Sequence, residues 1–279
     1  MSVLRCLTLN LWGAEPPLEA RMNMIAEGIR ALAPDVVALQ EVCDFPDLPN
    51  QAETLARATG LSFVFAPAVA FRGGHEGLAI LSRAPVLAHE SRELPHASEL
   101  ERRILLSAGL SVGERTVWVH VTHLNYRLTH GRQREDQVLA IDELVASRKE
   151  IEPQILMGDF NARPESDEMR WLCGLTTLRE RRTMYQDAWA RLHPGEAGWT
   201  WASANPYTRA LMFLQPDRRL DYIFVTPERR DGRARILDCR MVFDQPTGGV
   251  YASDHFGLFA EVQIAPDPVA APKSPPAVA

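Results

Sequence analysis

Hydrophobic residues near the N-terminus follow two different periods. Residues 3–11 are apolar on both faces of a two-residue repeat, which predicts a strand buried between two layers. Residues 35–41 predict a second buried strand, and Pro34 ends the segment before it. Between the strands, apolar residues recur at spacings of three and four and predict a helix with one apolar stripe: Leu18, Met22, Ile25, Ile29 and Leu32. Strand, helix and strand together predict a right-handed parallel crossover, so both strand ends meet at one sheet edge.

The rest of the chain is rich in short strands. Runs separated by short turns predict antiparallel pairing over residues 61–66, 77–82, 86–94, 104–111 and 116–123. A second helix is predicted over residues 129–147. Later strands are predicted over residues 153–159, 198–201, 220–225, 236–243 and 256–264. Many strands with few helices predict two packed sheets covered by helices.

Composition narrows the class of protein. A chain of 279 residues with 46% hydrophobic and 24% charged residues is typical of a globular protein, not of a disordered, collagen-like or coiled-coil one. Its length allows about two domains or one large α/β domain. We expect folded structure over residues 1–265, followed by a disordered tail over residues 266–279, which is rich in proline and alanine. The longest apolar run, residues 63–71, is too short for the ~20 residues of a membrane-spanning helix.

Charge and cysteine usage bear on partners and compartment. Thirty Lys and Arg residues against 36 Asp and Glu residues leave a net charge of −6, which does not attract duplex DNA but leaves room for a locally basic cleft. The four cysteines form no paired motif and are expected to be reduced, structural thiols. The N-terminus lacks the features of a signal peptide, so a cytoplasmic protein is expected.

Polar residues stand at the ends of otherwise apolar strands at six places. They are Asn10, Glu41, His123, Asp159 with Asn161, Asp221, and Asp254 with His255. Polar groups there are costly unless they are paired or face a solvated cleft, so together they predict the rim of an active site. Carboxylates and amides are oxygen ligands that suit Mg²⁺, whereas a zinc site would contain more histidine or thiolate. Histidines beside them suit proton transfer or stabilisation of a phosphate.

Each of these residues alone also has a structural explanation. Asn10 could cap a turn, and Asp159 with Asn161 could build an Asx-turn. His120 is interpreted as an ordinary sheet residue on the face opposite His123. Only the joint pattern favours a site.

Seven segments carry a family resemblance. LNLW, LQEV, EGLAILSR, THL, MGDFN, RLDYIFV and SDHFGLF follow one another between residues 9 and 259. In this order they resemble the endonuclease/exonuclease/phosphatase superfamily, which includes pancreatic-type deoxyribonuclease, exonuclease III-like repair endonucleases, inositol polyphosphate 5-phosphatases and neutral sphingomyelinases. The resemblance implies one domain with an α/β fold, a four-layered sandwich of two mixed, largely antiparallel sheets flanked by helices.

The resemblance also implies a metal centre and a second, phosphate-binding histidine. Glu41 resembles the principal Mg²⁺ ligand, with Asn10 and Asp254 close to the metal or the phosphate, and Mn²⁺ is a plausible substitute. His123 resembles the phosphate-stabilising histidine of the nuclease and sphingomyelinase branches. Glu76 resembles the supporting glutamate that orients this histidine.

The remaining roles concern the attacking water. Asp159 and Asn161 resemble the pair that orients and activates it. His255 resembles the general acid/base histidine, and Asp221 the carboxylate that fixes its tautomer. The identity of the general base stays open between Asp159 and His255.

These parts predict Mg²⁺-dependent hydrolysis of a phosphoester by in-line attack of water. The acidic surplus and scattered arginines favour a compact phosphodiester or phosphomonoester. A nucleic-acid nuclease and a lipid phosphodiesterase of the sphingomyelinase type are the alternatives, and a non-catalytic binding protein ranks last. A serine hydrolase based on Ser253 is disfavoured, because no G-x-S-x-G elbow surrounds it. No obligate protein partner is predicted.

Candidate substrate contacts come from basic and aromatic residues near the predicted site. Arg127 lies close to His123 along the chain, and Arg218 and Arg219 precede Asp221. The aromatic segment 198–215 is either core packing or an apolar lid over the leaving group. Its Trp201 and Tyr207, with Arg127, are the candidate substrate-binding residues.

Overall fold

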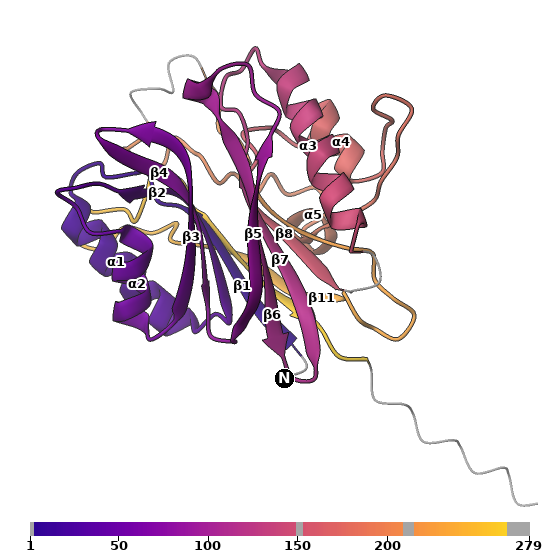
Figure 1. The fold of residues 1–279 in the computed structure, drawn as a ribbon, viewed down its shortest axis with the longest axis horizontal. Coiled ribbons are helices and arrows are strands. Elements are labelled where there is room, and N and C mark those ends of the chain that lie inside the picture. The colour runs from indigo at the N-terminus through magenta and orange to yellow at the C-terminus, as the bar shows by residue number, and fades with distance from the viewer. Residues whose placement is uncertain (1–2, 149–152, 209–214, 267–279) are drawn as a thin grey trace, which may run out of the picture.

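Two six-stranded sheets stacked face to face form the centre of the protein (Figure 1). The computed structural model describes residues 3–148, 153–208 and 215–266. The first sheet has the order β11 (Ile236–Val242), β12 (Gly257–Gln263), β1 (Val3–Asn10), β2 (Val36–Asp44), β4 (Gly74–Ser82) and β3 (Ser62–Phe71). The second has the order β5 (Val86–Leu94), β6 (Arg103–Val112), β7 (Arg115–His123), β8 (Gln154–Asp159), β10 (Asp221–Val225) and β9 (Gln186–Asp187).

Helices cover the outer faces of both sheets. Apolar residues of α1 (Leu18–Leu32) and α2 (Gln51–Thr59) pack on the first sheet. Those of α3 (Gly131–Ala146) and α4 (Asp167–Leu172) pack on the second, and Figure 1 shows the two helical groups on opposite sides. The shorter α5 (Ala188–Leu192) and the 3₁₀ turn η1 (Glu99–Glu101) complete the described helices. This confirms the predicted sandwich of two mixed sheets flanked by helices.

Each sheet contains one parallel pair, β1 with β2 and β7 with β8, and every other pairing is antiparallel. In sequence α1 connects the first pair and α3 the second, so the predicted parallel crossover from β1 to β2 is confirmed. Because the carboxyl ends of a parallel pair meet, Asn10 pairs with Gln40, and His123 pairs with Asp159. The antiparallel neighbour β10 begins at that same level, where Asp221 pairs with Asp159.

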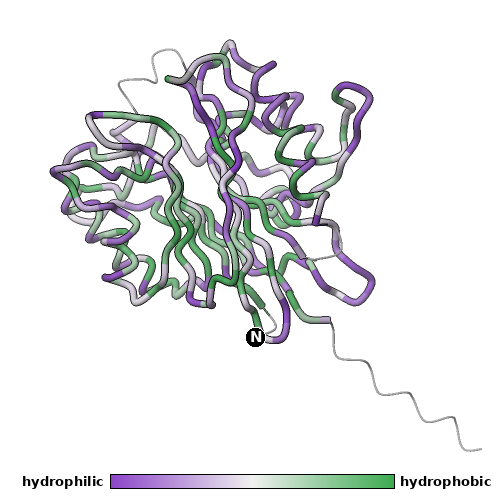
Figure 2. Tube along the Cα trace, viewed as in Figure 1, coloured by the Kyte–Doolittle hydropathy of each residue, from purple (hydrophilic) through white to green (hydrophobic). Residues whose placement is uncertain are grey.

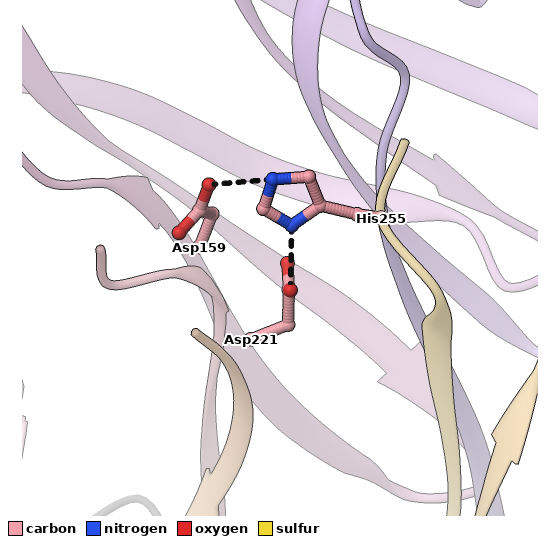
Figure 3. Close-up of side chains that lie close together, drawn as sticks. All are labelled: Asp159, Asp221 and His255. Carbon is pink, nitrogen blue, oxygen red and sulfur yellow. Dashed lines mark hydrogen bonds and ion pairs between the residues drawn. The ribbon is translucent and has the colours of Figure 1, made fainter. Parts of the chain in front are cut away.

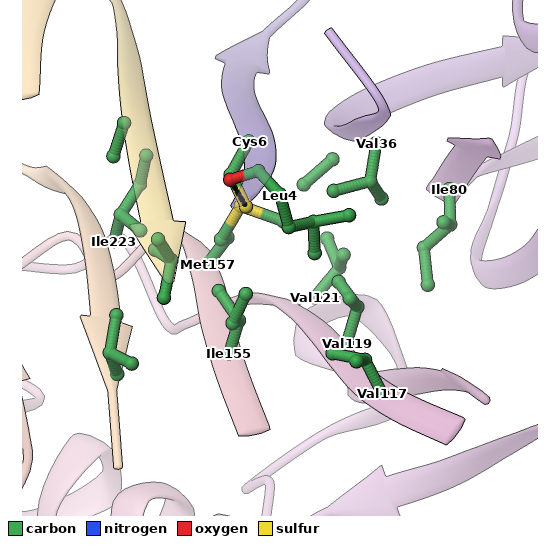
Figure 4. Close-up of a cluster of buried hydrophobic side chains, with 14 of the residues drawn as sticks. Leu4, Cys6, Val36, Ile80, Val117, Val119, Val121, Ile155, Met157 and Ile223 are labelled. Atoms are coloured by element: carbon green, nitrogen blue, oxygen red, sulfur yellow. Dashed lines mark hydrogen bonds between the residues drawn. The ribbon is translucent and has the colours of Figure 1, made fainter. Parts of the chain in front are cut away.

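The interior between the sheets is apolar. Alternate residues of β7, namely Val117, Val119 and Val121, face this core together with Ile155 and Met157 of β8 (Figure 4). Figure 2 shows hydrophobic strands at the centre, with hydrophilic residues on the outer loops and turns. Each such buried side chain contributes roughly 1.5–3 kcal/mol relative to exposure. The core thus forms a rigid base for the strand ends.

Some predicted elements differ from the observed ones. The strand predicted over residues 198–201 is wrong: only Trp201 forms an isolated bridge, with Arg218, because Thr200 bonds to the chain before β10 and before β12 instead. The structure also contains α2, α4, α5 and β9, none of which was predicted. Nearly all of the predicted tail, residues 267–279, lies outside the described residues. No helix in the described ranges is long and apolar enough to cross a membrane.

Candidate active site

Asn10 connects the two sheets at the ends of their parallel strands. Its fully buried side chain donates from Nδ2 to Oε1 of Glu41 (3.0 Å) and to Oδ2 of Asp159 (3.1 Å). Its Oδ1 accepts a hydrogen bond from the backbone N–H of Trp12 (2.9 Å). The amide nitrogen therefore faces both carboxylates and positions them, while its oxygen faces the Trp12 backbone.

A β-bulge presents Glu41 to the site. The register of β2 against β4 shifts between Leu39 and Val42, and Glu41 has a φ of 53°. A residue other than glycine in this left-handed region costs roughly 1–2 kcal/mol. The bulge places the Glu41 side chain in the wall of a cavity, which an uninterrupted strand would not do.

Glu41, Glu76 and Asp254 form a carboxylate cluster on one wall of this cavity. Burial, with the charges of Glu76 and Asp254, raises the pKa of Glu41 to about 8. Burial also raises the pKa of Glu76, and the nearby positive charge of Arg103 only partly opposes this. None of the three forms an ion pair with an arginine among the described residues. Clustered carboxylates without a cationic partner are the donor set that a hard divalent cation requires.

His255 stands between two aspartates (Figure 3). Its Nδ1 lies 2.8 Å from Oδ2 of the fully buried Asp221, and its Nε2 lies 3.8 Å from Oδ2 of Asp159. Burial alone would lower the pKa of His255, but the carboxylates of Asp221, Asp254 and Asp159 raise it well above its ordinary value. Ligand atoms of Asp159, Asp221 and His255 lie within 4.8 Å of one another, so this second group could also bind a metal ion.

Asp159 is the central carboxylate of the site. Its Oδ1 accepts the backbone N–H of Asn161 (2.8 Å), and its Oδ2 lies near Asn10, His123 and His255. Burial, with the charge of Asp221, raises the pKa of Asp159 to about 6, although His255 opposes the shift. Asn161, with a φ of 50°, donates from Nδ2 to the Leu124 carbonyl (3.2 Å). The turn 159–161 is thereby fixed to the end of β7.

His123 contacts an arginine that the sequence analysis missed. Nη1 of Arg103 donates to Nδ1 of His123 (3.3 Å), while Nε2 of His123 lies 3.5 Å from Oδ2 of Asp159. Burial and the charges of Arg103 and His255 lower the pKa of His123 well below its usual value, so its ring is neutral. The structure places Arg103, and not Glu76, against this nitrogen. The sequence signal for Arg103 was its position as the first residue of β6, the strand that pairs with β7.

A cavity of about 320 Å³ joins these groups. It is lined by Glu41, Glu76, Arg103, His123, Tyr126, Asp159, Asn161, Trp201, Gln215, Arg218, Leu220, Asp254 and His255. Asn10 and Asp221 lie directly behind this lining, in contact with Glu41 and His255. A larger hollow of about 610 Å³ between Cys173 and Glu228 contains none of the predicted site residues. The chemistry of the lining, not the size of the hollow, identifies the candidate site.

The predicted substrate contacts separate into two groups. Trp201 lines the cavity, whereas Tyr207 is stacked on Trp12, with ring centroids 4.6 Å apart. Arg127 does not line the cavity, because its guanidinium pairs with the buried Glu101. Arg218 lies in the cavity wall although it stood out in the sequence only as part of a basic pair.

Comparison with known proteins agrees with this architecture. A sequence model of the Endonuclease/Exonuclease/phosphatase family matches residues 7–255. The uncharacterized protein YbhP of Escherichia coli K12 is 26% identical over 171 residues, which span 56% of this chain and 66% of that protein. Nocturnin of Drosophila melanogaster is 25% identical over 284 residues, which span 89% of this chain and 42% of that protein.

A solved structure shows the same fold over nearly the whole chain. The D. rerio TDP2 structure complexed with a single-strand DNA product superposes with a TM-score of 0.74, at 22% identity, over 94% of this chain and 99% of that one. At this identity the likeness concerns the fold alone. The family match extends from β1 to His255 and so includes every residue of the candidate site. The chain belongs to the Endonuclease/Exonuclease/phosphatase family.

Proposed function

We propose that this protein is an Mg²⁺-dependent phosphoesterase that acts most readily on a compact phosphodiester. The observation that carries the proposal is the convergence on Asp159 of Asn10, His123 and His255, beside a carboxylate cluster that forms no ion pair with an arginine among the described residues. Members of the family are typically phosphoesterases or nucleases, which supports the reaction class.

The donor set fits a divalent metal. Glu41, Glu76 and Asp254 would hold it, since their clustered oxygens match the preference of Mg²⁺, with Mn²⁺ as a substitute. When bound, the metal supplies Lewis-acid charge to a phosphate oxygen. The Asp159, Asp221 and His255 group satisfies the distances for a metal, but the hydrogen bond between Asp221 and His255 favours a role in proton handling.

Asp159 is the general base in this proposal. A pKa of about 6 leaves its carboxylate largely ionised at neutral pH and able to take a proton from water. The hydrogen bonds from Asn10 and from the Asn161 backbone fix the direction of its two oxygens. His255, whose pKa is raised, stays protonated and donates toward the phosphate or the leaving oxygen. Asp221 holds its tautomer through Nδ1.

Arg103 and neutral His123 supply the remaining charge and hydrogen bonds. The Arg103 guanidinium lies beside His123 in the cavity wall, where it is positioned to contact a non-bridging oxygen. In-line displacement at phosphorus depends mainly on such positioning and charge neutralisation. The cavity volume and the net charge of −6 favour a small phosphoester over duplex DNA.

A nucleic-acid strand end is the second candidate substrate. It is favoured by the family membership and by the structural likeness to D. rerio TDP2, which is complexed with a single-strand DNA product.

Hydrolysis assays test the proposal. The panel is bis-p-nitrophenyl phosphate, p-nitrophenyl phosphate, plasmid DNA, a single-stranded oligonucleotide and sphingomyelin, each with Mg²⁺ and with chelator. We expect one preferred substrate, with turnover lost on chelation and reduced at least about 10²-fold in Asp159→Asn and His255→Ala. His89→Ala, which removes an exposed histidine from β5, is the control. Activity that survives chelation and both site variants, or folded protein without any activity, would contradict the proposal.

A further inference from the structure

Two arginines line the cavity and form no ion pair with a carboxylate among the described residues. Arg103 is 7% exposed, and its buried Nε has no hydrogen-bond partner among the described residues. The buried Nε of Arg218 also lacks one there. Arginines next to them in sequence pair with carboxylates: Arg102 contacts Glu93 (2.9 Å) and Arg219 contacts Asp187 (2.8 Å), although the buried Nε of Arg219 also lacks a hydrogen-bond partner among the described residues. Unsatisfied buried donors are costly, so these two N–H groups are suited to an acceptor from outside the chain, either water or an anion.

Arg218 is held rigidly at its place. Its guanidinium lies 4.6 Å from the ring centroid of Trp201, which is itself 3% exposed. The two backbones exchange both hydrogen bonds, each 2.9 Å long. Stacking on the indole fixes the plane of the guanidinium while leaving N–H groups at its edge for an anion. The result is a preorganised cationic wall.

The two arginines occupy different parts of the lining. Arg103 opens β6 and contacts His123, so it faces the phosphate that reacts in the proposed mechanism. Arg218 reaches the cavity from the segment before β10, with Trp201 and Leu220 beside it. A single phosphodiester carries one negative charge, which Arg103 and the metal already meet. Arg218 then faces no phosphate: the charge of Asp159 acts on it, but the two form no ion pair among the described residues.

We propose that Arg218, stacked on Trp201, forms a subsite for a second anionic group of the substrate beside the scissile phosphate. The substrate class is a small phosphoester with at least one further phosphate, such as a nucleoside bisphosphate or diphosphate. A cavity of about 320 Å³ has room for one such headgroup, near the lower end of ligand pockets. The inference rests on the proposed function for the placement of the first phosphate only.

Calorimetry on the full chain with Mg²⁺ tests this subsite without turnover. The probes are thymidine 5′-monophosphate, thymidine 5′-diphosphate and thymidine 3′,5′-bisphosphate. We expect one of the two-phosphate probes to bind about 10- to 100-fold more tightly than the monophosphate, the range for a charge-assisted contact. Arg218→Gln should bring this ratio close to one. Arg218→Lys, which keeps the charge but not the stacking, should retain part of it.

The control separates direct contact from general electrostatics. Arg163 acts on Arg218 through its charge, but it is exposed, pairs with Glu165 and does not line the cavity. Arg163→Gln should therefore keep the ratio. A wild-type ratio near one, or an equal loss in the Arg163 variant, would overturn the subsite. Since the wild-type ratio needs no variant, the test does not depend on whether Arg218→Gln folds.

Two further outcomes remain distinct. If a five-nucleotide single strand shows an Arg218-dependent gain and the small probes do not, the second anion belongs to a nucleic-acid strand and the proposal of a small substrate fails. If the ratio appears as expected but none of the phosphoesters in the hydrolysis panel is cleaved, the proposed function fails while the anion subsite stands.

Discussion

The Nδ2 atom of Asn10 lies 3.1 Å from Oδ2 of Asp159, although the two residues are 149 positions apart and belong to different sheets. The same nitrogen donates to Glu41. One amide group therefore lies between Glu41, the proposed metal ligand, and Asp159, the proposed base for the attacking water. Two like charges held this close need a fixed donor between them. Asn10 is thus the residue through which the sheets share a site.

Replacing Asn10 tests this spacing. Asn10→Ala leaves two buried carboxylates without their shared donor, so we expect the free energy of unfolding to fall by about 1–3 kcal/mol and turnover to fall at least tenfold. Asn10→Asp should be worse on both counts, because it adds a third negative charge. Urea unfolding and steady-state kinetics measure both effects. Equal behaviour of the two variants would show that the charge of residue 10 is irrelevant.

Asp221→Asn tests the orientation of His255. The amide cannot stabilise the imidazolium, so the pKa of His255 should fall, and turnover should drop by about 10²- to 10⁴-fold. The sign follows from the proposed role. Because His255 acts protonated, a lower pKa moves the alkaline limb of the pH–rate profile to lower pH.

The control for this prediction is Asp238→Asn, which changes an aspartate of β11 that lies outside the cavity lining. It should leave the profile unchanged. A profile of Asp221→Asn that keeps its alkaline limb at the wild-type pH would remove His255 from the role of acid.

The sequence indicates some of these residues far better than others. Glu41, Asp159 and His255 stand at the ends of apolar strands, where a polar side chain is costly and therefore conspicuous. Arg103 and Arg218 were missed as site residues because a guanidinium is ordinary on a surface, and only the fold brings them into the cavity wall with a buried Nε that has no hydrogen-bond partner among the described residues.

The same contrast holds for the fold. The long periodic segments of β1, α1 and β2 were predicted close to their observed bounds. The helix α2 was missed because it is only nine residues long, although Asn50 caps it by accepting from Ala52 and Glu53. The false strand at 198–201 had a strand composition, but Thr200 accepts the backbone N–H groups of Leu220 and Asp221 on its side-chain hydroxyl and not in a strand ladder.

Replacing Glu41 should stabilise the metal-free fold and abolish the binding of Mg²⁺. The pKa of Glu41 is about 8 in the metal-free fold, compared with an ordinary value of 4.5. Between these two pH values the unfolded chain ionises this carboxyl group while the fold keeps it protonated, so the free energy of unfolding falls as the pH rises. Glu41→Gln should therefore raise the free energy of unfolding by about 1–3 kcal/mol at pH 7 in chelator. It should also lose activity and the increase in Tm that Mg²⁺ gives the wild type. Differential scanning calorimetry with and without Mg²⁺ measures both. If Glu41→Gln were less stable than the wild type in chelator, the interpretation that the metal-free carboxylate cluster destabilises the fold would be wrong.

His120 predicts acid sensitivity away from the site. It is fully buried between Ser107 (Nδ1 to Oγ, 2.7 Å) and Gln154 (Nε2 to Oε1, 3.1 Å), and burial lowers its pKa to about 4. Below its ordinary value of 6.5, only the unfolded chain takes up the proton, so stability falls as the pH drops from 6.5 toward 4.

Comparison with His120→Gln isolates this contribution. Between pH 7.5 and 5, the variant should lose about 2 kcal/mol less stability than the wild type, because it has no imidazole to titrate. The exposed His89, changed to Gln, is the matched control and should follow the wild type. Identical pH slopes for His120→Gln and wild type would show that the imidazole is protonated at no cost in the fold.

Arg21 predicts a link between the fold and metal affinity. This fully buried residue of α1 donates to carbonyls of the segment after β1, including Leu11 (2.7 Å) and Glu15 (2.8 Å), and to that of Ala252 before β12 (3.1 Å). It therefore fixes the two segments that adjoin Asn10 and Asp254. No described carboxylate pairs with it.

Lysine at position 21 keeps the charge, but its single ammonium group cannot donate to all of these carbonyls at once, as the planar guanidinium of arginine does. Arg21→Lys should lower the free energy of unfolding by about 2–3 kcal/mol and weaken Mg²⁺ binding, because Asn10 and Asp254 lose their common support. Arg30→Lys on the same helix loses only one exposed bond, to the Ala58 carbonyl, and should change neither quantity. Titration of Mg²⁺ by calorimetry, below the unfolding temperature of each variant, separates the two effects. A purely structural arginine would lower stability and leave Mg²⁺ affinity unchanged, whereas a positioning residue lowers both.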